Sequence, residues 1–221
     1  MELRGLDKEV RAEIEKAAVT VRELRIDLEA GNKRLEQIAE EWLDVGGTAR
    51  EKLVAEFGDL WASMRLWACA LPKAGRREVA LLLDARCEQV QGFQDDIRLH
   101  ETELEPVVAR LNGARAELDA ARYNWRMSEA SRLGGGTCQT AACQLARSRI
   151  QKLEKKARPL RESVEILDRW LVRIQREIEE QFGQRVGVKF HYLKKASWRE
   201  SVAQAEGERL AAWAAEQLGR L

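Results

Sequence analysis

The sequence predicts an all-α protein: a long antiparallel coiled-coil helical hairpin with additional helices packed beside it. Apolar residues recur in alternating steps of three and four along most of the chain, and this repeat makes helices pack side by side along a narrow apolar seam. Only three of the 221 residues are proline, so few positions oppose a helix. Three consecutive glycines at 134–136 separate two long heptad runs, and a short break of this kind makes two helices antiparallel neighbours.

The first predicted region, residues 1–75, holds two helices at the base of the bundle. The first helix is expected over about residues 6–45, and Gly31 is the one seam position in it that is not apolar. A second helix follows Gly46 and Gly47. Pro72 and Gly75 predict its end, because proline lacks a backbone donor and glycine weakens a helix.

The second predicted region, residues 76–182, is the hairpin itself, with its tip at 134–137. Twelve of fourteen seam positions in its first helix are apolar, and Arg86 and His100 are the exceptions. The returning helix, about 138–182, carries an unbroken apolar seam: Ile150, Leu153, Ala157, Leu160, Val164, Leu167, Leu171, Ile174 and Ile178.

The third predicted region, residues 183–221, begins with a different period. Val186, Val188, Phe190 and Tyr192 alternate with other residues, and a period of two is typical of a strand. We therefore consider one short extended strand near 185–193, lying against the bundle or added to a partner's sheet. Ser197 is the expected cap of a last helix that ends at about residue 219.

Composition and motifs exclude several classes of protein. The sequence has no run of about 18 apolar residues, so no membrane span is predicted. The charged N-terminus lacks the apolar core of a signal peptide. We expect a cytoplasmic protein without a membrane partner. The sequence contains no phosphate-binding loop, nucleophile elbow, H-E-x-x-H or dinucleotide motif. A narrow seam also offers no pocket to shift a carboxylate pKa. We expect no enzyme, no catalytic residue, no small-molecule substrate and no cofactor.

The net charge of +1 conceals strong segregation of charge along the chain. Residues 88–109 sum to −5, and residues 110–161 sum to +8 from twelve basic and four acidic side chains. None of the twelve lies on the seam, so all are free to face solvent. The residues predicted to contact an anionic partner are Arg122, Arg126, Arg132, Arg147, Arg149, Lys152, Lys155, Lys156, Arg158 and Arg161.

This charge pattern predicts a non-catalytic coiled-coil scaffold or adaptor subunit whose basic hairpin tip contacts an anionic partner. DNA or RNA within a larger assembly, bound through its phosphates, is the favoured partner. An acidic protein, or the acidic segment of another copy of this chain, is the other anionic partner that the pattern allows. The alternative is a structural protein that self-associates through its seams, its segments of opposite charge or its tip cysteines, with no nucleic-acid role. A second basic cluster lies among aromatic residues, a mixture that suits single-stranded nucleic acid: Lys189, Lys194, Lys195 and Arg199.

Two cysteines, Cys138 and Cys143, flank the start of the returning helix. Three readings remain open for them: small residues packed at a loop, a disulfide within the chain, or a zinc ion shared between the tips of two copies. Two thiolates do not complete a tetrahedral zinc site, so we predict no metal site within a single chain.

Overall fold

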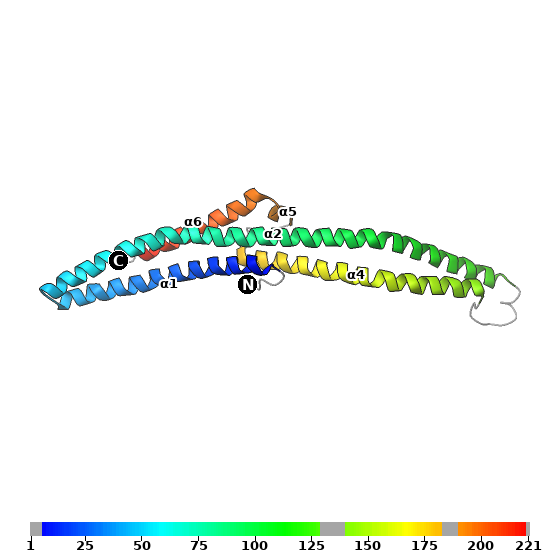
Figure 1. Cartoon of the computed structure of the whole chain (residues 1–221), viewed down its shortest axis with the longest axis horizontal. Helices are drawn as coiled ribbons and strands as arrows, with labels where there is room; N and C mark the ends of the chain where they lie inside the picture. The colour runs from blue at the N-terminus through cyan, green and yellow to red at the C-terminus, as the bar shows by residue number, and fades with distance from the viewer. Residues whose placement is uncertain (1–5, 129–139, 183–189, 220–221) are drawn as a thin grey trace. The chain divides into compact units, whose positions relative to one another are not determined.

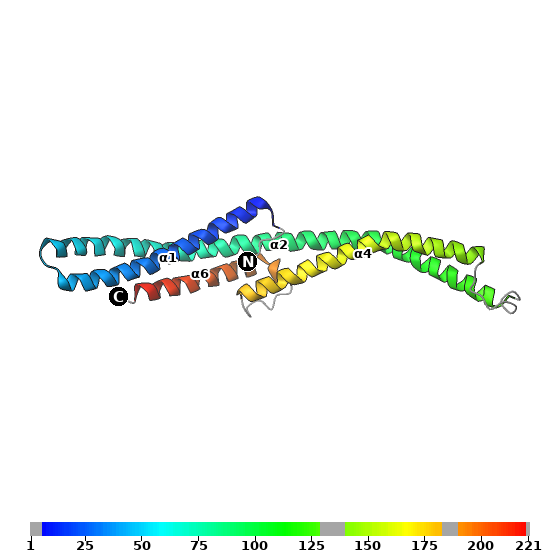
Figure 2. The same ribbon diagram turned by 90° about the horizontal axis from the view of Figure 1, so that it is seen from below.

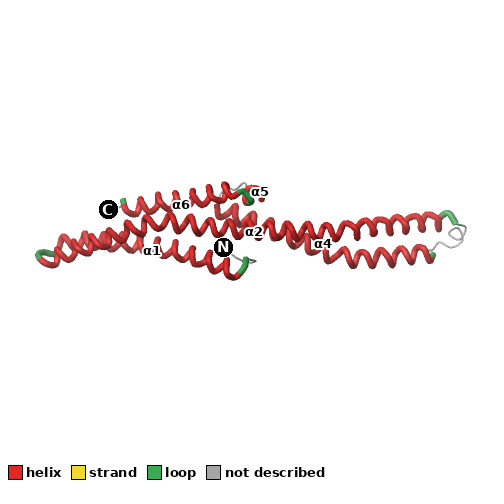
Figure 3. Tube along the Cα trace, turned by 45° about the horizontal axis from the view of Figure 1, so that its top comes forward, coloured by secondary structure: helices red, strands yellow, loops and turns green. Residues whose placement is uncertain are grey.

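The structure, a computed structural model, describes residues 6–128, 140–182 and 190–219, and within these ranges it is all-α, as predicted (Figures 1 and 3). The helices are α1 (Lys8–Asp44), α2 (Thr48–Arg126), α4 (Ala141–Phe182), α5 (Phe190–Leu193) and α6 (Ala196–Leu218). No helix in the described part of the chain combines the length and the apolar character needed to cross a membrane.

Internal contacts divide the chain into two compact units. Unit 1 comprises Met1–Gln89 and Glu177–Leu221, and unit 2 comprises Val90–Arg176. Unit 1 therefore contains α1, α5, α6 and the first part of α2. Unit 2 contains the remaining part of α2 and most of α4.

Helices α1 and α2 run antiparallel in unit 1 and are joined by a tight turn (Figure 2). Asp7 caps α1, because its side chain accepts a hydrogen bond of 2.8 Å from the Glu9 backbone N–H. Gly47 has a φ of 59° at the turn, a left-handed conformation that glycine adopts without a steric penalty. The same turn starts α2, since the Gly47 carbonyl accepts bonds from the N–H groups of Arg50 and Glu51.

The core of unit 1 is built from three helices. It comprises the α1 residues Leu28, Leu35 and Ile38, the α2 residues Met64 and Leu71, and the α6 residues Leu210 and Ala214. The α1 and α2 members lie on the seams predicted from the sequence. Gly31, the gap in the α1 seam, is buried where a side chain would meet the Met64 sulfur at 2.8 Å. The missing side chain therefore makes room for Met64.

Exposed charges add contacts between α1 and α2. The Arg34 guanidinium donates to both carboxylate oxygens of Glu56, at 2.7 and 3.1 Å, and to Glu41 at 2.9 Å. Hydrogen bonding to Arg34 lowers the pKa of the Glu56 carboxyl below its ordinary value. Exposed pairs of this kind contribute little to stability, but the two-pronged geometry specifies how the helices align.

The predicted end of the second helix at Pro72 and Gly75 is wrong, because α2 continues from Thr48 to Arg126 through both residues. The proline costs α2 one backbone hydrogen bond, which burial on either side offsets: Leu71 and Val79 are almost completely buried. Gly75 has a tertiary role, since a Cβ at this position would overlap the Leu210 side chain of α6. The glycine therefore allows close approach of α6.

The extended strand considered near 185–193 is not found where the structure describes it. Residues 190–193 form the short helix α5, and residues 183–189 lie outside the described ranges. The predicted cap of the last helix is also wrong. Helix α6 begins at Ala196 after Lys195, which makes no side-chain capping bond. Arg199 tethers this start instead, donating to the Leu193 carbonyl at 2.7 Å and to Asp84 of α2 at 2.6 Å.

Candidate functional site

In unit 2, α2 and α4 lie side by side and run antiparallel (Figures 1 and 3). Leu118 and Ala121 of α2 pack with Cys143, Ala146 and Ile150 of α4. Leu118, Ala121 and Ile150 lie on the predicted seam, and Cys143 and Ala146 extend it toward the start of α4. Assigning Leu118 to heptad position a and Ala121 to position d places Cys143 and Ile150 at a and Ala146 at d on α4. Positions e and g then lie on opposite flanks of the seam, and in antiparallel pairs e faces e and g faces g.

Two ion pairs fix the register of the helices, one on each flank. Arg115 and Glu154, both at e, approach to 3.2 Å between Nη2 and Oε1. Glu117 and Arg149, both at g, approach to 2.9 Å between Oε2 and Nη1. We call these sides the e flank and the g flank. Because the helices are antiparallel, a step of seven residues forward along α2 corresponds to seven residues back along α4.

One such step from each ion pair brings like charges together. On the e flank, Arg122 lies seven residues after Arg115 and Arg147 lies seven before Glu154, so two arginines face each other. On the g flank, Arg110 lies seven residues before Glu117 and Lys156 lies seven after Arg149. The register therefore sets two cations opposite each other on both flanks, at positions where opposite charges would stabilise the helix pair.

The basic side chains of unit 2 point to solvent. Every basic residue of the 110–161 segment that the structure describes is exposed, and Arg132 lies outside the described residues. The described acidic residues of the segment are already engaged: Glu117 and Glu154 as above, and Asp119 with Arg122 at 3.7 Å. Arg158 bonds Glu162 at 2.8 Å. Within the described ranges, no ion pair involves the following six cations: Arg110, Arg147, Lys152, Lys155, Lys156 and Arg161.

The helices distribute these cations around unit 2. Arg122, Arg126, Arg147, Arg158 and Arg161 belong to the e flank and its adjoining b positions. The g flank and its adjoining c position hold a second set, namely Arg110, Arg149, Lys152 and Lys156. Lys155 lies on the outer face of α4. The described cations therefore line both flanks of unit 2 and the outer face of α4. We call them together, with Arg110 and Arg115, the basic segment surface.

The second predicted cluster is not a comparable surface. Lys194 and Lys195 are exposed, and the Lys195 ammonium lies 5.4 Å from the centre of the Tyr192 ring. Arg199 instead turns inward, since its guanidinium bonds Asp84 and Leu193 and lies 3.6 Å from the Cys87 sulfur. Lys189 lies outside the described residues. Arg199 therefore holds α6 against α2 within unit 1.

Cys143 is completely buried and takes part in a disulfide. Cys138 lies outside the described residues, and Cys69 and Cys87 are free thiols. A disulfide sulfur is not the thiolate that zinc requires, so Cys143 in this form is not a zinc ligand. Within the described ranges, no group of three or more histidine, cysteine, aspartate and glutamate residues is arranged to hold a metal ion.

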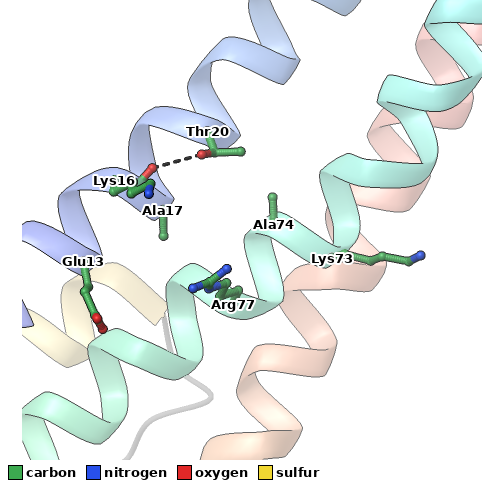
Figure 4. A pocket seen from close by; sticks show the side chains of 7 residues that line it. All are labelled: Glu13, Lys16, Ala17, Thr20, Lys73, Ala74 and Arg77. Carbon is green, nitrogen blue, oxygen red and sulfur yellow. Dashed lines mark hydrogen bonds between the residues drawn. The ribbon is translucent and has the colours of Figure 1, made fainter.

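A pocket of about 360 Å³ lies between α1 and α2 in unit 1 (Figure 4). Its charged lining is Glu13, Lys16, Lys73 and Arg77. Figure 4 shows Lys73 directed away from α1, and the Thr20 hydroxyl donates to the Lys16 carbonyl of its own helix at 3.0 Å. No nucleophile is hydrogen-bonded to a base among the residues that line this pocket.

Comparison with protein-family models, with curated proteins and with solved structures finds no match to this chain. Sequence reasoning identified the basic residues but missed their facing arrangement across the seam. The heptad positions contained that signal, because e and g residues meet their own kind in an antiparallel pair.

Proposed function

We propose that this protein is a non-catalytic scaffold or adaptor whose basic segment surface binds the phosphate backbone of a nucleic acid. The observation that carries the proposal is the placement of like charges across the seam, Arg122 opposite Arg147 and Arg110 opposite Lys156. Such positions lower stability when the protein is free. An anion lying between the two cations removes their repulsion. The free energy that the repulsion costs the free protein is therefore regained when the anion binds.

The dimensions of the surface fit a polyanion better than a small anion. Arg147 and Arg161 are 14 residues apart on α4, about 21 Å at ~1.5 Å per residue. One DNA strand presents about six phosphates over that length. Arginine suits this role, because its planar guanidinium donates two hydrogen bonds to one phosphate. No base-specific contact follows from this arrangement, so we expect binding that depends on charge and salt rather than on sequence.

The test is a salt titration against labelled duplex DNA and RNA, with affinity followed by fluorescence anisotropy. Wild-type affinity should fall linearly on a log–log plot as salt rises, with a slope of about −0.9 for each phosphate neutralised. Reversing four charges on α4, with Lys152→Glu, Lys155→Glu, Lys156→Glu and Arg158→Glu, should abolish the binding.

A matched variant controls for net charge. Lys8→Glu, Lys33→Glu, Lys52→Glu and Lys73→Glu change the total charge by the same amount at exposed positions of unit 1. This variant should bind as the wild type does. Equal loss of affinity in both variants, or no salt-sensitive binding by the wild type, would exclude the basic segment surface as the nucleic-acid site.

A further inference from the structure

The e flank carries a second like-charge position, and this one is acidic. Glu101 lies two heptads before Arg115 on α2, and Asp168 lies two heptads after Glu154 on α4. The register that joins Arg115 to Glu154 therefore sets Glu101 opposite Asp168. Both carboxylates are exposed, and neither forms an ion pair with any residue that the structure describes.

The acidic and basic positions have the same separation on both helices. Arg122 follows Glu101 by 21 residues on α2, and Asp168 follows Arg147 by 21 residues on α4. The two positions are therefore separated by about 31 Å, at ~1.5 Å per residue. Among neighbouring charges at positions e and b, Glu105 and Glu165 lie near the acidic position and Arg126 lies beyond the basic one. Arg158 and Arg161 lie between the two positions on α4.

We propose that the e flank of unit 2 docks onto the same flank of a second copy of this chain, antiparallel and related by a two-fold axis. The axis sets the acidic position of each copy against the basic position of the other. Because the separation is the same in both copies, the two contacts form together. Each contact replaces like-charge repulsion within a chain by attraction between chains.

Charge complementarity selects a second copy as the occupant of this flank. A nucleic acid accounts for Arg122 and Arg147, but its phosphates are repelled by Glu101 and Asp168 on the same flank. A second copy provides an opposite charge for all four of these residues. Val108, at the e position near the middle of the flank and only partly exposed, adds an apolar contact close to the axis. This docking does not depend on nucleic-acid binding, and the two partners compete for the same arginines.

Charge-swap variants test the docking by sedimentation of the full chain over a range of concentrations. Glu101→Lys with Asp168→Lys makes both the acidic and the basic position of the flank basic, and Arg122→Glu with Arg147→Glu makes both positions acidic. Each variant alone should associate at least about tenfold more weakly than the wild type, because both contacts become repulsive. An equimolar mixture of the two variants should restore the dimer, which also demonstrates that both are folded.

The matched control reverses the same number of basic charges on the g flank, with Arg110→Glu and Lys156→Glu, and should leave the dimer intact. Wild type that remains monomeric at every concentration would overturn the proposal, as would a mixture that fails to recover the dimer. The variant with Glu101→Lys and Asp168→Lys separates dimerisation from the proposed nucleic-acid binding. It retains the whole basic segment surface and should still bind DNA, whether or not the chain dimerises.

Discussion

Arg115 of α2 and Glu154 of α4 meet across the e flank at 3.2 Å. Both side chains are about half exposed, so their pairing contributes at most about 1 kcal/mol to stability. The position of the pair carries more information than its energy. Once these two residues are opposite, the antiparallel geometry assigns every other e residue of α2 its neighbour on α4. The facing arginines and the facing carboxylates both follow from this one contact.

A pair of glycine substitutions tests the close packing of α6 on α2. Gly75→Ala should lower the free energy of unfolding by about 1–3 kcal/mol, because the new Cβ overlaps the Leu210 side chain. Gly113→Ala should raise it by about 0.5–1 kcal/mol, since space at that position is open and alanine is the better helix former. Urea denaturation followed by circular dichroism measures both. Equal effects of the two substitutions would contradict the close approach at Gly75.

Removing the partner of the buried Arg86 in unit 1 should destabilise the protein more than removing the partner and replacing the arginine by an apolar residue as well. Arg86 is 2% exposed and donates to Glu177 at 2.7 Å and to Gln89 at 2.7 Å. Glu177→Ala should cost about 2–3 kcal/mol, because it leaves a buried charge less well compensated. Adding Arg86→Met should recover much of this loss, since an apolar side chain suits the seam. A double-mutant cycle in chemical denaturation checks this, and simple additivity would contradict it.

Glu78 should make unit 1 less stable as the pH rises. Burial raises the pKa of its carboxyl above the ordinary value, with a further increase from nearby Glu206 and a decrease from Arg22. A raised folded-state pKa means that the folded protein binds the proton more tightly, so stability is lost as the pH rises from the ordinary value through the folded value. Arg209, bonded to Glu206 at 2.6 Å, moderates the repulsion.

Glu78→Gln should therefore stabilise the protein at pH 7, by less than about 1 kcal/mol because the group is only partly buried. The corresponding rise in Tm is at most about 4 °C. Thermal unfolding at pH 7 and pH 4 measures the difference, which should shrink at the lower pH, where Glu78 itself becomes protonated. A stabilisation that grows at low pH would contradict this assignment.

The heptad repeat predicted the all-α fold and many core residues, because burial of an amphipathic face is local information. Leu28, Leu35 and Leu118 are buried where the period places them. The repeat did not reveal that α2 continues through Pro72 and Gly75. Rules for proline and glycine describe an isolated helix, whereas here α6, from the far end of the chain, packs over Gly75. A contact between segments so far apart cannot be predicted from the residues around Gly75 alone.

The alternating pattern that reaches into α5 was misleading there for a related reason. A period of two over a few residues is weak, and Tyr192 and Leu193 are helical in the structure. For the candidate site, too, one part could be predicted from the sequence and another could not. Exposure of the basic residues followed from their absence from the seam. Their apposition required the register between α2 and α4, which becomes known only when Arg115 and Glu154 are placed together.

The most direct test of the central claim measures stability and nucleic-acid binding in the same substitution series at position 147. If Arg122 and Arg147 repel each other, Arg147→Gln should stabilise the free protein and Arg147→Glu should stabilise it further, by about 0.5 kcal/mol in total. Affinity for duplex DNA should fall severalfold in the same order. A loss of stability in Arg147→Glu, or DNA affinity unchanged across the series, would contradict the account.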